Sequence, residues 1–226
     1  YSMFPIDIVC INDERDGTFP NHHPDPCVEK NLEQLKQKVI EVGADIGLSF
    51  DGDGDRMGMV SENAKFLPTD QFMTIIVRDI INKVNKKEFL CDVKCSKSFK
   101  DEVEKLGGKC VTYRTGNSYT KAAVRDMDLP FGGELSGHVY FRDRWPGFDS
   151  GLYAGLRMLE ILTLEKEKLS TLVDSLNKRI EFLKVVIKEL GLTKIEAIHA
   201  RAEEYAINNR ERYDVVTARA VAKRNT

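Results

Sequence analysis

The strongest constraint on the fold is that segments patterned as β-strands alternate with segments patterned as α-helices along most of the chain. Such alternation is typical of α/β proteins, because helices that cross between strands cover the faces of a sheet. We therefore expect mixed α/β layers. The expected strands lie at 6–11, 46–50, 57–60, 88–93, 109–114 and 139–141, and the expected helices at 26–43, 69–84, 96–106, 150–164 and from about 118 onward.

The helix expected at 26–43 has the clearest local signals. Pro26 suits the first helical position, and Asp25 before it is a plausible N-cap. Gly43 is expected to end the helix. Its apolar residues recur at helical spacing and predict one buried stripe. They are Val28, Leu32, Leu35, Val39 and Val42.

The composition indicates a globular chain whose main part has no membrane or nucleic-acid partner. The net charge is −2 and the sequence pI is near 6.2, which gives no general attraction to nucleic acid or to an anionic membrane. No apolar run approaches the roughly 20 residues of a membrane span, and the N-terminal residues lack the basic region of a signal peptide. The five cysteines form no Cys-x-x-Cys pair, so we expect buried thiols in a reducing cytoplasm.

The sequence Asp-Gly-Asp-Gly-Asp-Arg at 51–56 places three carboxylates at alternate positions, directly after the expected strand 46–50. Mg²⁺ binds oxygen ligands at about 2.0–2.1 Å, and three carboxylates that point the same way can supply three of them. Glycine has no Cβ, so the backbone can fold tightly around an ion. We therefore predict a metal site made of Asp51, Asp53 and Asp55.

Two alternatives compete with a magnesium site in this loop. It could be a solvated acidic turn, because Asp-Gly pairs are common turn formers. It could also be a calcium loop of the EF-hand type, with the three aspartates at positions 1, 3 and 5 and Glu62 at position 12. An EF-hand needs glycine at the sixth position, where this chain has Arg56, and it needs helices on both sides. The flanks here are strand-like, which argues against the EF-hand.

A second polar loop at 132–138 has the sequence Gly-Gly-Glu-Leu-Ser-Gly-His. Its polar groups suit the neighbouring hydroxyls of a sugar, since glutamate accepts two hydrogen bonds and serine both donates and accepts them. The sequence Thr-Gly-Asn-Ser at 115–118 lies between a strand and a helix, with Lys121 one turn further on, and helix N-termini of this kind bind anions. Each loop alone could also be an ordinary glycine-rich turn or a helix cap.

Together these loops resemble the α-D-phosphohexomutases, particularly the bacterial phosphomannomutase/phosphoglucomutase branch. The resemblance implies the C-terminal part of domain 2 at 1–65, with the metal loop, and domain 3 at 66–170, with the sugar-binding loop. The similar stretches follow the order of the family: Asp16–Pro26, Ala44–Arg56, Asp92–Cys95, Thr115–Ser118, Gly132–His138 and Asp143–Asp149.

The resemblance also implies the chemistry of a phosphomutase, an isomerase. A phosphoserine of the first domain would give its phosphoryl group to a mannose or glucose phosphate, and the resulting bisphosphate would return its other phosphate to the serine. By this resemblance Asp51, Asp53 and Asp55 hold Mg²⁺, which neutralises charge during the transfer.

The resemblance further assigns roles to single residues. Arg56 would lie beside the transferring phosphate, and it is a candidate catalytic residue together with Lys94. Glu134 and Ser136 would hold sugar hydroxyls, with His138 close by in the pocket. The candidate substrate-binding residues are Asn117, Ser118, Glu134, Ser136 and His138.

This chain also departs from the family in three ways. Asn117 stands where many phosphomannomutases have histidine, and asparagine cannot carry a proton near neutral pH. No Ser-His-Asn type phosphoserine loop and no Arg-x-Ser-Gly-Thr type phosphate-binding loop occur in the sequence. We therefore expect a piece of a longer protein. The alternative to an active mutase is a non-catalytic module that binds Mg²⁺ and sugar phosphate.

Beyond about residue 170 the pattern predicts a partial Rossmann-like β-α-β-α-β tail over 171–226. Its strands are expected at 170–174, 195–198 and 213–221. The tail resembles the ribosomal RNA guanine-N7 methyltransferases of the glucose-inhibited-division-B type through 172–179, 199–204 and 214–222.

This second resemblance implies that Asp174, Ala202 and Glu203 face S-adenosylmethionine, that Arg219 lies near the catalytic cleft, and that ribosomal RNA is the substrate. The glycine-rich loop that should precede Asp174 is absent, so the methionine end of the cofactor has no cradle. We therefore expect a truncated tail that transfers no methyl group.

Overall fold

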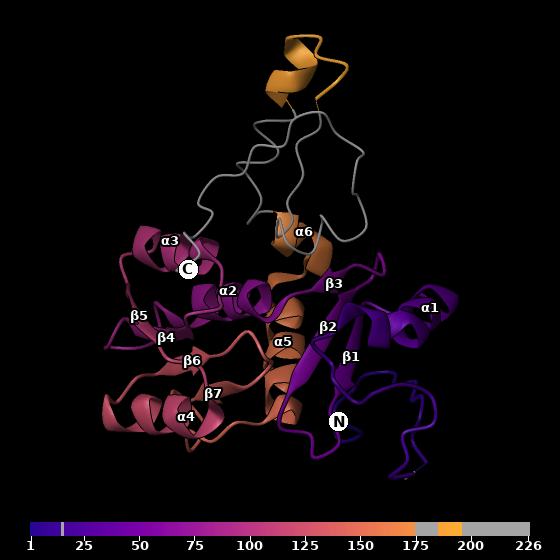
Figure 1. The fold of residues 1–226 in the computed structure, drawn as a ribbon, viewed down its shortest axis with the longest axis horizontal. Helices are drawn as coiled ribbons and strands as arrows, with labels where there is room; N and C mark the ends of the chain where they lie inside the picture. The colour runs from indigo at the N-terminus through magenta and orange to yellow at the C-terminus, as the bar shows by residue number, and fades with distance from the viewer. Residues whose placement is uncertain (15, 175–184, 196–226) are drawn as a thin grey trace, which may run out of the picture. The chain divides into compact units, whose positions relative to one another are not determined.

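The computed structural model describes residues 1–14, 16–174 and 185–195. The chain divides into two units, 1–176 and 177–226. The first unit holds two sheets with the helices around them, which confirms the expected mixed α/β layers (Figure 1). In the second unit the described residues are 185–195, of which 185–189 are helical. The tail strand expected at 213–221, and all but the first residue of the one expected at 195–198, lie outside the described residues.

The first sheet contains β1 (Ile46–Phe50), β2 (Met57–Ser61) and β3 (Phe66–Leu67), which pair antiparallel in that order. Phe50 pairs with Met57, so residues 51–56 form the loop that joins β1 to β2. β2 is buried along its whole length, because its side chains alternate between two apolar clusters. Met57 and Met59 belong to the main core, whereas Val60 belongs to a smaller cluster.

A short 3-10 helix and an α-helix pack on this sheet: η1 (Glu29–Leu32) and α1 (Glu33–Val42). Gly43 ends α1 with a φ of +66°, a left-handed conformation that glycine adopts at low steric cost, as predicted. The predicted start at Pro26 is wrong. The Asp25 carboxylate accepts a hydrogen bond from the backbone N–H of Cys27 at 3.0 Å, so it caps a separate turn before the helix.

The buried stripe of this helical segment is shorter than the sequence predicts. Val28 and Val42 are 46% and 44% exposed, because one precedes the helical residues and the other lies at the helix end. The side chains that pack toward the sheet are Leu32, Leu35 and Val39.

Residues 6–11 do not form the predicted strand. The side chains at 7–10 are exposed, and no described strand pairs with this segment. A strand needs a neighbour to satisfy its backbone N–H and C=O groups. An apolar run without such a neighbour therefore stays irregular.

The second sheet has the strand order β5-β4-β6-β7. β4 pairs parallel with β5 and β6, and β7 pairs antiparallel with β6. The two crossovers between parallel strands contain α3 (Lys97–Lys105) and α4 (Asn117–Asp126). The loops after β4, β5 and β6 therefore meet at one edge of the sheet. The strands are β4 (Glu88–Asp92), β5 (Lys109–Tyr113), β6 (Phe131–Gly133) and β7 (Val139–Phe141).

The sequence places 132–138 in a single loop, but its first two residues belong to β6 (Phe131–Gly133). Glycine has a low strand propensity, so the sequence Gly132-Gly133 does not predict a strand. Close packing requires glycine here. A Cβ at Gly132 would lie 2.9 Å from the Cβ of Leu90 and from a methyl group of Val124.

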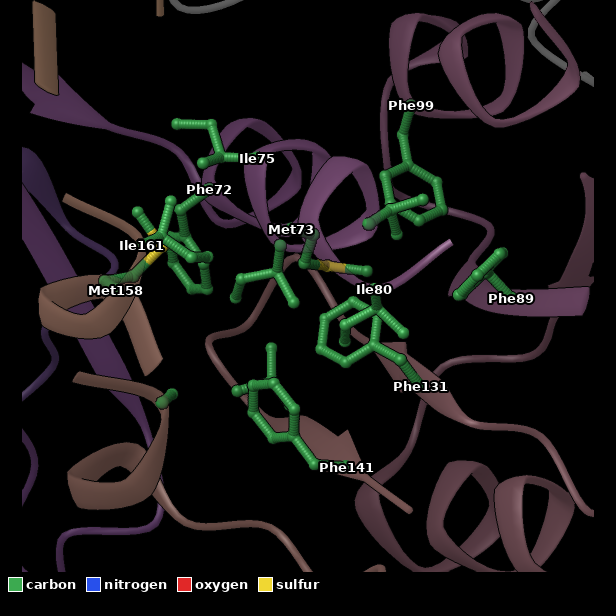
Figure 2. Close-up of a cluster of buried hydrophobic side chains, with 14 of the residues drawn as sticks. Phe72, Met73, Ile75, Ile80, Phe89, Phe99, Phe131, Phe141, Met158 and Ile161 are labelled. Atoms are coloured by element: carbon green, nitrogen blue, oxygen red, sulfur yellow. The ribbon is translucent and has the colours of Figure 1, made fainter. Parts of the chain in front are cut away.

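The two sheets share one hydrophobic core. It contains Met57 and Met59 from the first sheet together with Phe131 and Phe141 from the second. Side chains of α2 (Thr69–Ile80) and α5 (Gly151–Glu165) complete it, and Figure 2 shows those of Phe72, Met73 and Ile80 among them. Burial of each large apolar side chain contributes about 1.5–3 kcal/mol, so this core fixes the loops of one sheet against those of the other.

Residues 170–174 form part of a helix, α6 (Leu169–Asp174), and not the predicted strand. Leu169 is buried, and Leu172 and Val173 pack against the main core. These three residues have the spacing i, i+3, i+4 of one helix face, and a short apolar run of this kind is compatible with either a strand or a helix. The backbone N–H of Ser170 donates a hydrogen bond to Glu62 at 3.2 Å, and its hydroxyl also donates to Glu62. These contacts fix the helix on the first unit.

A buried ion network joins α2, α5 and the loop after β7. Arg157 is 3% exposed, and its Nη1 donates to Asp143 at 2.8 Å while its Nη2 lies 3.5 Å from Asp79.

Among the described residues, none of the helices is both long and apolar enough to cross a membrane.

Candidate functional site

Polar groups of three loops meet at the carboxyl ends of β4, β5 and β6. Asp92 ends β4 and is 1% exposed. The hydroxyl of Thr115 donates a hydrogen bond to Asp92 Oδ2 at 2.7 Å, and the N–H of Leu135 donates to Oδ1 at 3.2 Å. Asp92 therefore ties the loop after β5 to the loop after β6.

Glu134, directly after β6, is also 1% exposed. Its carboxylate accepts hydrogen bonds from the N–H of Gly116 at 2.8 Å, from the hydroxyl of Ser136 at 3.0 Å and from the hydroxyl of Thr120. These protein donors make Glu134 an anchor of its loop. Contact of Glu134 and Ser136 with sugar hydroxyls stays a prediction.

The loop at 51–56 turns tightly, as its glycines predict. Gly54 has a φ of +74°, and its N–H donates to the carbonyl of Asp51 at 3.3 Å. The N–H of Gly151 donates to the carbonyl of Gly54 at 3.0 Å, which ties the loop to the start of α5. A Cβ at Gly151 would lie 2.5 Å from the Arg56 carbonyl oxygen, so only glycine permits this approach.

Arg56 closes the loop by pairing with Asp51. Its Nε donates to Asp51 Oδ2 at 2.6 Å, and its backbone N–H donates to Oδ1 at 3.1 Å. Burial raises the pKa of Asp51, but the hydrogen bonds from Arg56 outweigh burial and lower that pKa below its ordinary value. Nη1 of Arg56 also lies 3.6 Å from Asp25 Oδ1. One aspartate of the loop is therefore held ionised by the protein itself.

The three aspartates together fit a hard divalent cation. One oxygen from each of Asp51, Asp53 and Asp55 lies within 4.8 Å of the others, and octahedral Mg²⁺ places its ligand oxygens about 2.8–4.2 Å apart. Burial raises the pKa of Asp55 to about 6, the charges of neighbouring aspartates add to the rise, and His138 opposes it. This concentration of negative charge is what a cation would relieve.

The loops at 51–56 and 132–138 lie next to each other. Arg56 and His138 form an antiparallel β-bridge, and the N–H of Met57 donates to the carbonyl of Gly137 at 3.4 Å. Gly137 has a φ of +98°, and a Cβ there would lie 2.6 Å from the sulfur of Cys27. The structure therefore brings together two loops that lie some 80 residues apart in sequence.

His138 lies between two carboxylates. Its Nδ1 is 2.9 Å from Asp149 Oδ2 and 3.6 Å from Asp55 Oδ1, and its side chain is 15% exposed. Burial lowers the pKa of His138, but the hydrogen bond to Asp149 and the charge of Asp55 outweigh burial and raise it. The ring therefore lies beside the loop at 51–56 and binds a proton more tightly than an ordinary histidine.

Asp149 is held by three side chains. Lys121 Nζ lies 2.8 Å from Oδ1, and Asn117 Nδ2 donates to Oδ2 at 2.7 Å, beside the imidazole of His138. The Tyr140 hydroxyl donates to Asn117 Oδ1 at 3.2 Å and fixes the amide in turn. Burial raises the pKa of Asp149, but the hydrogen bonds from His138 and Lys121 outweigh it and lower that pKa far below its usual range. Asn117, which cannot carry a proton, therefore holds the carboxylate of Asp149 in place.

The other predicted site residues have less to define them. Lys94 is exposed in the turn after β4, and Ser118 is exposed in the first turn of α4. Both lie at the carboxyl edge of the second sheet, and their roles stay predictions. In the tail, Asp174 is exposed at the end of α6, whereas Ala202, Glu203 and Arg219 lie outside the described residues.

Sequence reasoning missed three residues that hold the site together: Asp92, Thr120 and Asp149. A weak signal existed for Asp92 and Asp149, because Asp92 begins the stretch 92–95 and Asp149 ends the stretch 143–149, which both resemble the family. The partners of Asp149 lie 11, 28 and 32 residues away, so no local pattern could assign it a contact.

Models of one protein family match the residues that form both sheets. A family model described as phosphoglucomutase/phosphomannomutase, alpha/beta/alpha domain II, matches residues 1–64, and the domain III model of the same family matches 68–180. A further model, described as rRNA small subunit methyltransferase G, matches 148–226 and so overlaps the domain III match.

Curated relatives carry the same family names. A phosphomannomutase/phosphoglucomutase of Pseudomonas syringae is 37% identical over 194 residues, which is 86% of this chain and 42% of the relative. The protein of that name from Pseudomonas putida is 41% identical over 159 residues, or 70% of this chain and 34% of the relative. The chain therefore spans about two fifths or less of the length of these relatives.

Solved structures show the same fold. A phosphoglucomutase/phosphomannomutase family protein from Burkholderia thailandensis is 40% identical, with a TM-score of 0.68, over 71% of this chain and 35% of that one. A structure described as a phosphomannomutase from Thermus thermophilus is 22% identical, with a TM-score of 0.62, over 69% of this chain and 35% of that one, and it supports the fold alone.

Proposed function

Because the chain belongs to the phosphoglucomutase/phosphomannomutase family, we propose that it carries the metal-binding and sugar-binding part of a phosphohexomutase. The reaction moves a phosphoryl group between positions 1 and 6 of a hexose phosphate through a hexose bisphosphate. The observation that carries the proposal is the meeting of Asp51, Asp53 and Asp55 with Arg56 and His138 at one site.

In this proposal Asp51, Asp53 and Asp55 hold Mg²⁺, which neutralises charge on the transferring phosphoryl group when bound. Arg56 keeps Asp51 ionised and presents its remaining guanidinium donors beside the loop. A planar guanidinium is well suited to a phosphate group. Lys94, exposed at the same edge of the second sheet, is the proposed second cation for phosphate.

His138 is the proposed proton acceptor. As the attacking sugar hydroxyl forms its bond to phosphorus, the bond between phosphorus and the donor oxygen breaks, and the hydroxyl proton passes to Nε2 of His138. The charged ring then lies between Asp149 and Asp55. Glu134, Ser136, Asn117 and Ser118 are the proposed sugar-binding groups around it.

The phosphoryl donor is not among these residues. The 226 residues include no Ser-His-Asn sequence of the kind that would carry the phosphoserine. For this chain alone we therefore expect binding of hexose bisphosphate without turnover. A coupled mutase assay with bisphosphate activator checks this, and turnover by the purified chain would show that the donor serine is dispensable.

Binding of hexose 1,6-bisphosphate, measured by isothermal titration in Mg²⁺, tests the proposed site itself. Lys94→Met should weaken binding about tenfold, which corresponds to about 1.4 kcal/mol. Lys100→Met is the matched control, because Lys100 is an exposed lysine of α3 that lies near Glu104. An equal loss of affinity in both variants would show that Lys94 acts only through its charge and not at a specific site. No binding by the wild-type chain would reject the sugar-phosphate site.

A second candidate function concerns the tail. The match of residues 148–226 to the rRNA small subunit methyltransferase G model favours binding of S-adenosylmethionine there. Photo-crosslinking with labelled S-adenosylmethionine should label Asp174, Ala202 or Glu203 if this function is present. Absence of label at these positions would leave the mutase part as the functional one.

A further inference from the structure

The contacts of His138 separate its two ring nitrogens. Within the described residues, the polar contacts of the ring involve Nδ1, which faces Asp149 at 2.9 Å, Asn117 at 3.3 Å and Asp55 at 3.6 Å. Two carboxylates on one side of the ring demand a donor there, because ionised carboxylates only accept hydrogen bonds. The opposite nitrogen, Nε2, is left for a ligand.

Asp149 is built to impose this arrangement. Its carboxylate is buried, and Lys121 and Asn117 hold one oxygen each at 2.8 and 2.7 Å. Asn117 is itself fixed by the Tyr140 hydroxyl, and Tyr140 is fully buried in β7. Because both oxygens of the Asp149 carboxylate are held, its orientation is fixed. The orientation of the His138 ring is then set by its contact with this carboxylate.

Two donors converge on Oδ2 of Asp149: the Asn117 amide and His138 Nδ1. The Asn117 amide nitrogen lies farther from Nδ1, at 3.3 Å, than Asp149 Oδ2 does, at 2.9 Å, and an ionised carboxylate oxygen can only accept a hydrogen bond. Nδ1 therefore has to carry a proton whether the ring is neutral or charged. The partner of one ring nitrogen thus selects the state of the other, as in other histidine sites with an orienting carboxylate.

We propose that Asp149, clamped by Lys121 and Asn117, is the positioning residue that keeps the proton of neutral His138 on Nδ1 and leaves Nε2 as the acceptor for the sugar hydroxyl. The role of Nε2 rests on the proposed function, whereas the position of the proton does not. Asn117 thereby has a role through Asp149, although it cannot itself carry a proton.

The test is a long-range ¹H–¹⁵N spectrum of the full chain labelled with ¹⁵N-histidine, at alkaline pH where the ring is neutral. The chain has four histidines, and His138→Gln assigns the signal by removing it. In the wild type we expect the proton on Nδ1. In Asp149→Asn the tautomer should reverse, because an amide N–H can donate to an unprotonated Nδ1. A proton on Nε2 in the wild type, or the same tautomer in both proteins, would overturn the proposal.

Two further variants keep the test decisive. Asp143→Asn changes a carboxylate of the same loop that pairs with Arg157, so the His138 tautomer should be unchanged. Lys121→Met leaves Asp149 in place but frees one of its oxygens, so the Nδ1–H tautomer should persist with a smaller population. If Asp149→Asn does not fold, an unchanged tautomer population in Lys121→Met would refute the clamp.

The outcome is separate from the proposed function. The spectrum is recorded without Mg²⁺ or sugar, so it reports the Asp149–His138 contact alone. If the tautomer behaves as expected and hexose bisphosphate does not bind, the positioning contact stands and the sugar site fails. If the bisphosphate binds and the tautomer does not respond to Asp149→Asn, the sugar site stands and the positioning role fails.

Discussion

The carboxylates of Asp92 and Glu134, at the ends of β4 and β6, differ from those in the loop after β1, although both groups lie at strand ends. Asp92 and Glu134 are 1% exposed and accept hydrogen bonds from backbone and hydroxyl donors of neighbouring loops. Asp55 lies partly exposed among other carboxylates, which together with burial raise its pKa to about 6. The comparison shows that the fold uses one group to join its loops and leaves the other able to receive a cation.

The largest effect on stability should come from the loop-joining group. Glu134→Ala leaves the N–H of Gly116 and the hydroxyls of Thr120 and Ser136 without their acceptor in a buried setting. We expect a loss of about 3 kcal/mol in the free energy of unfolding, measured by urea denaturation. A loss below about 0.5 kcal/mol, the size of an ordinary surface substitution, would mean that Glu134 does not anchor the loop.

A smaller, pH-dependent effect is expected at a carboxylate that is only partly buried. Burial raises the pKa of Glu102, but the hydrogen bonds from Arg78 and Lys105 outweigh it and lower that pKa below 4.5. A lowered pKa in the folded state stabilises the protein above the unfolded pKa, and this contribution is lost as the pH falls through the folded pKa.

Glu102→Gln should therefore cost about 0.5–1 kcal/mol near neutral pH. The difference from wild type should shrink as the pH falls below 4.5, which denaturation curves at several pH values can follow. A difference that grows on acidification would contradict the sign of this pKa shift.

The smallest effect on stability should come from the metal loop. Asp53 lies in the exposed part of this loop, so without added metal Asp53→Asn should change the free energy of unfolding by less than about 0.5 kcal/mol. Thermal unfolding with a chelator present measures it. A clear loss would place Asp53 with the structural carboxylates and break the distinction between the two groups.

Local patterns predicted what depends on neighbours in sequence. The strand into the loop at 51–56, its tight glycine turn and the end of α1 at Gly43 follow from adjacent residues, and the structure confirms them. Short apolar runs were less informative. No strand of the described residues pairs with 6–11, and Leu169, Leu172 and Val173 have a spacing that suits the helix α6.

Long-range partners were beyond sequence reasoning. Glu134 was expected to hold a sugar, but its hydrogen bonds to Gly116 and Thr120 depend on how the loops after β5 and β6 meet. The same holds for Asp149, whose contact with His138 depends on the turn after β7. The sequence shows which chemical groups these residues carry, whereas their hydrogen-bond partners can be identified only from the folded structure.

Titration of Mg²⁺ by isothermal calorimetry tests the central claim most directly. The wild-type chain should bind one Mg²⁺, and Asp53→Asn should weaken this binding by at least about tenfold, since it removes one of three carboxylate ligands. Asp101→Asn, which changes a half-buried aspartate of α3 that pairs with Lys97, should leave the affinity unchanged. Equal Mg²⁺ affinity of the wild-type chain and Asp53→Asn would contradict the assignment of this loop as the metal site.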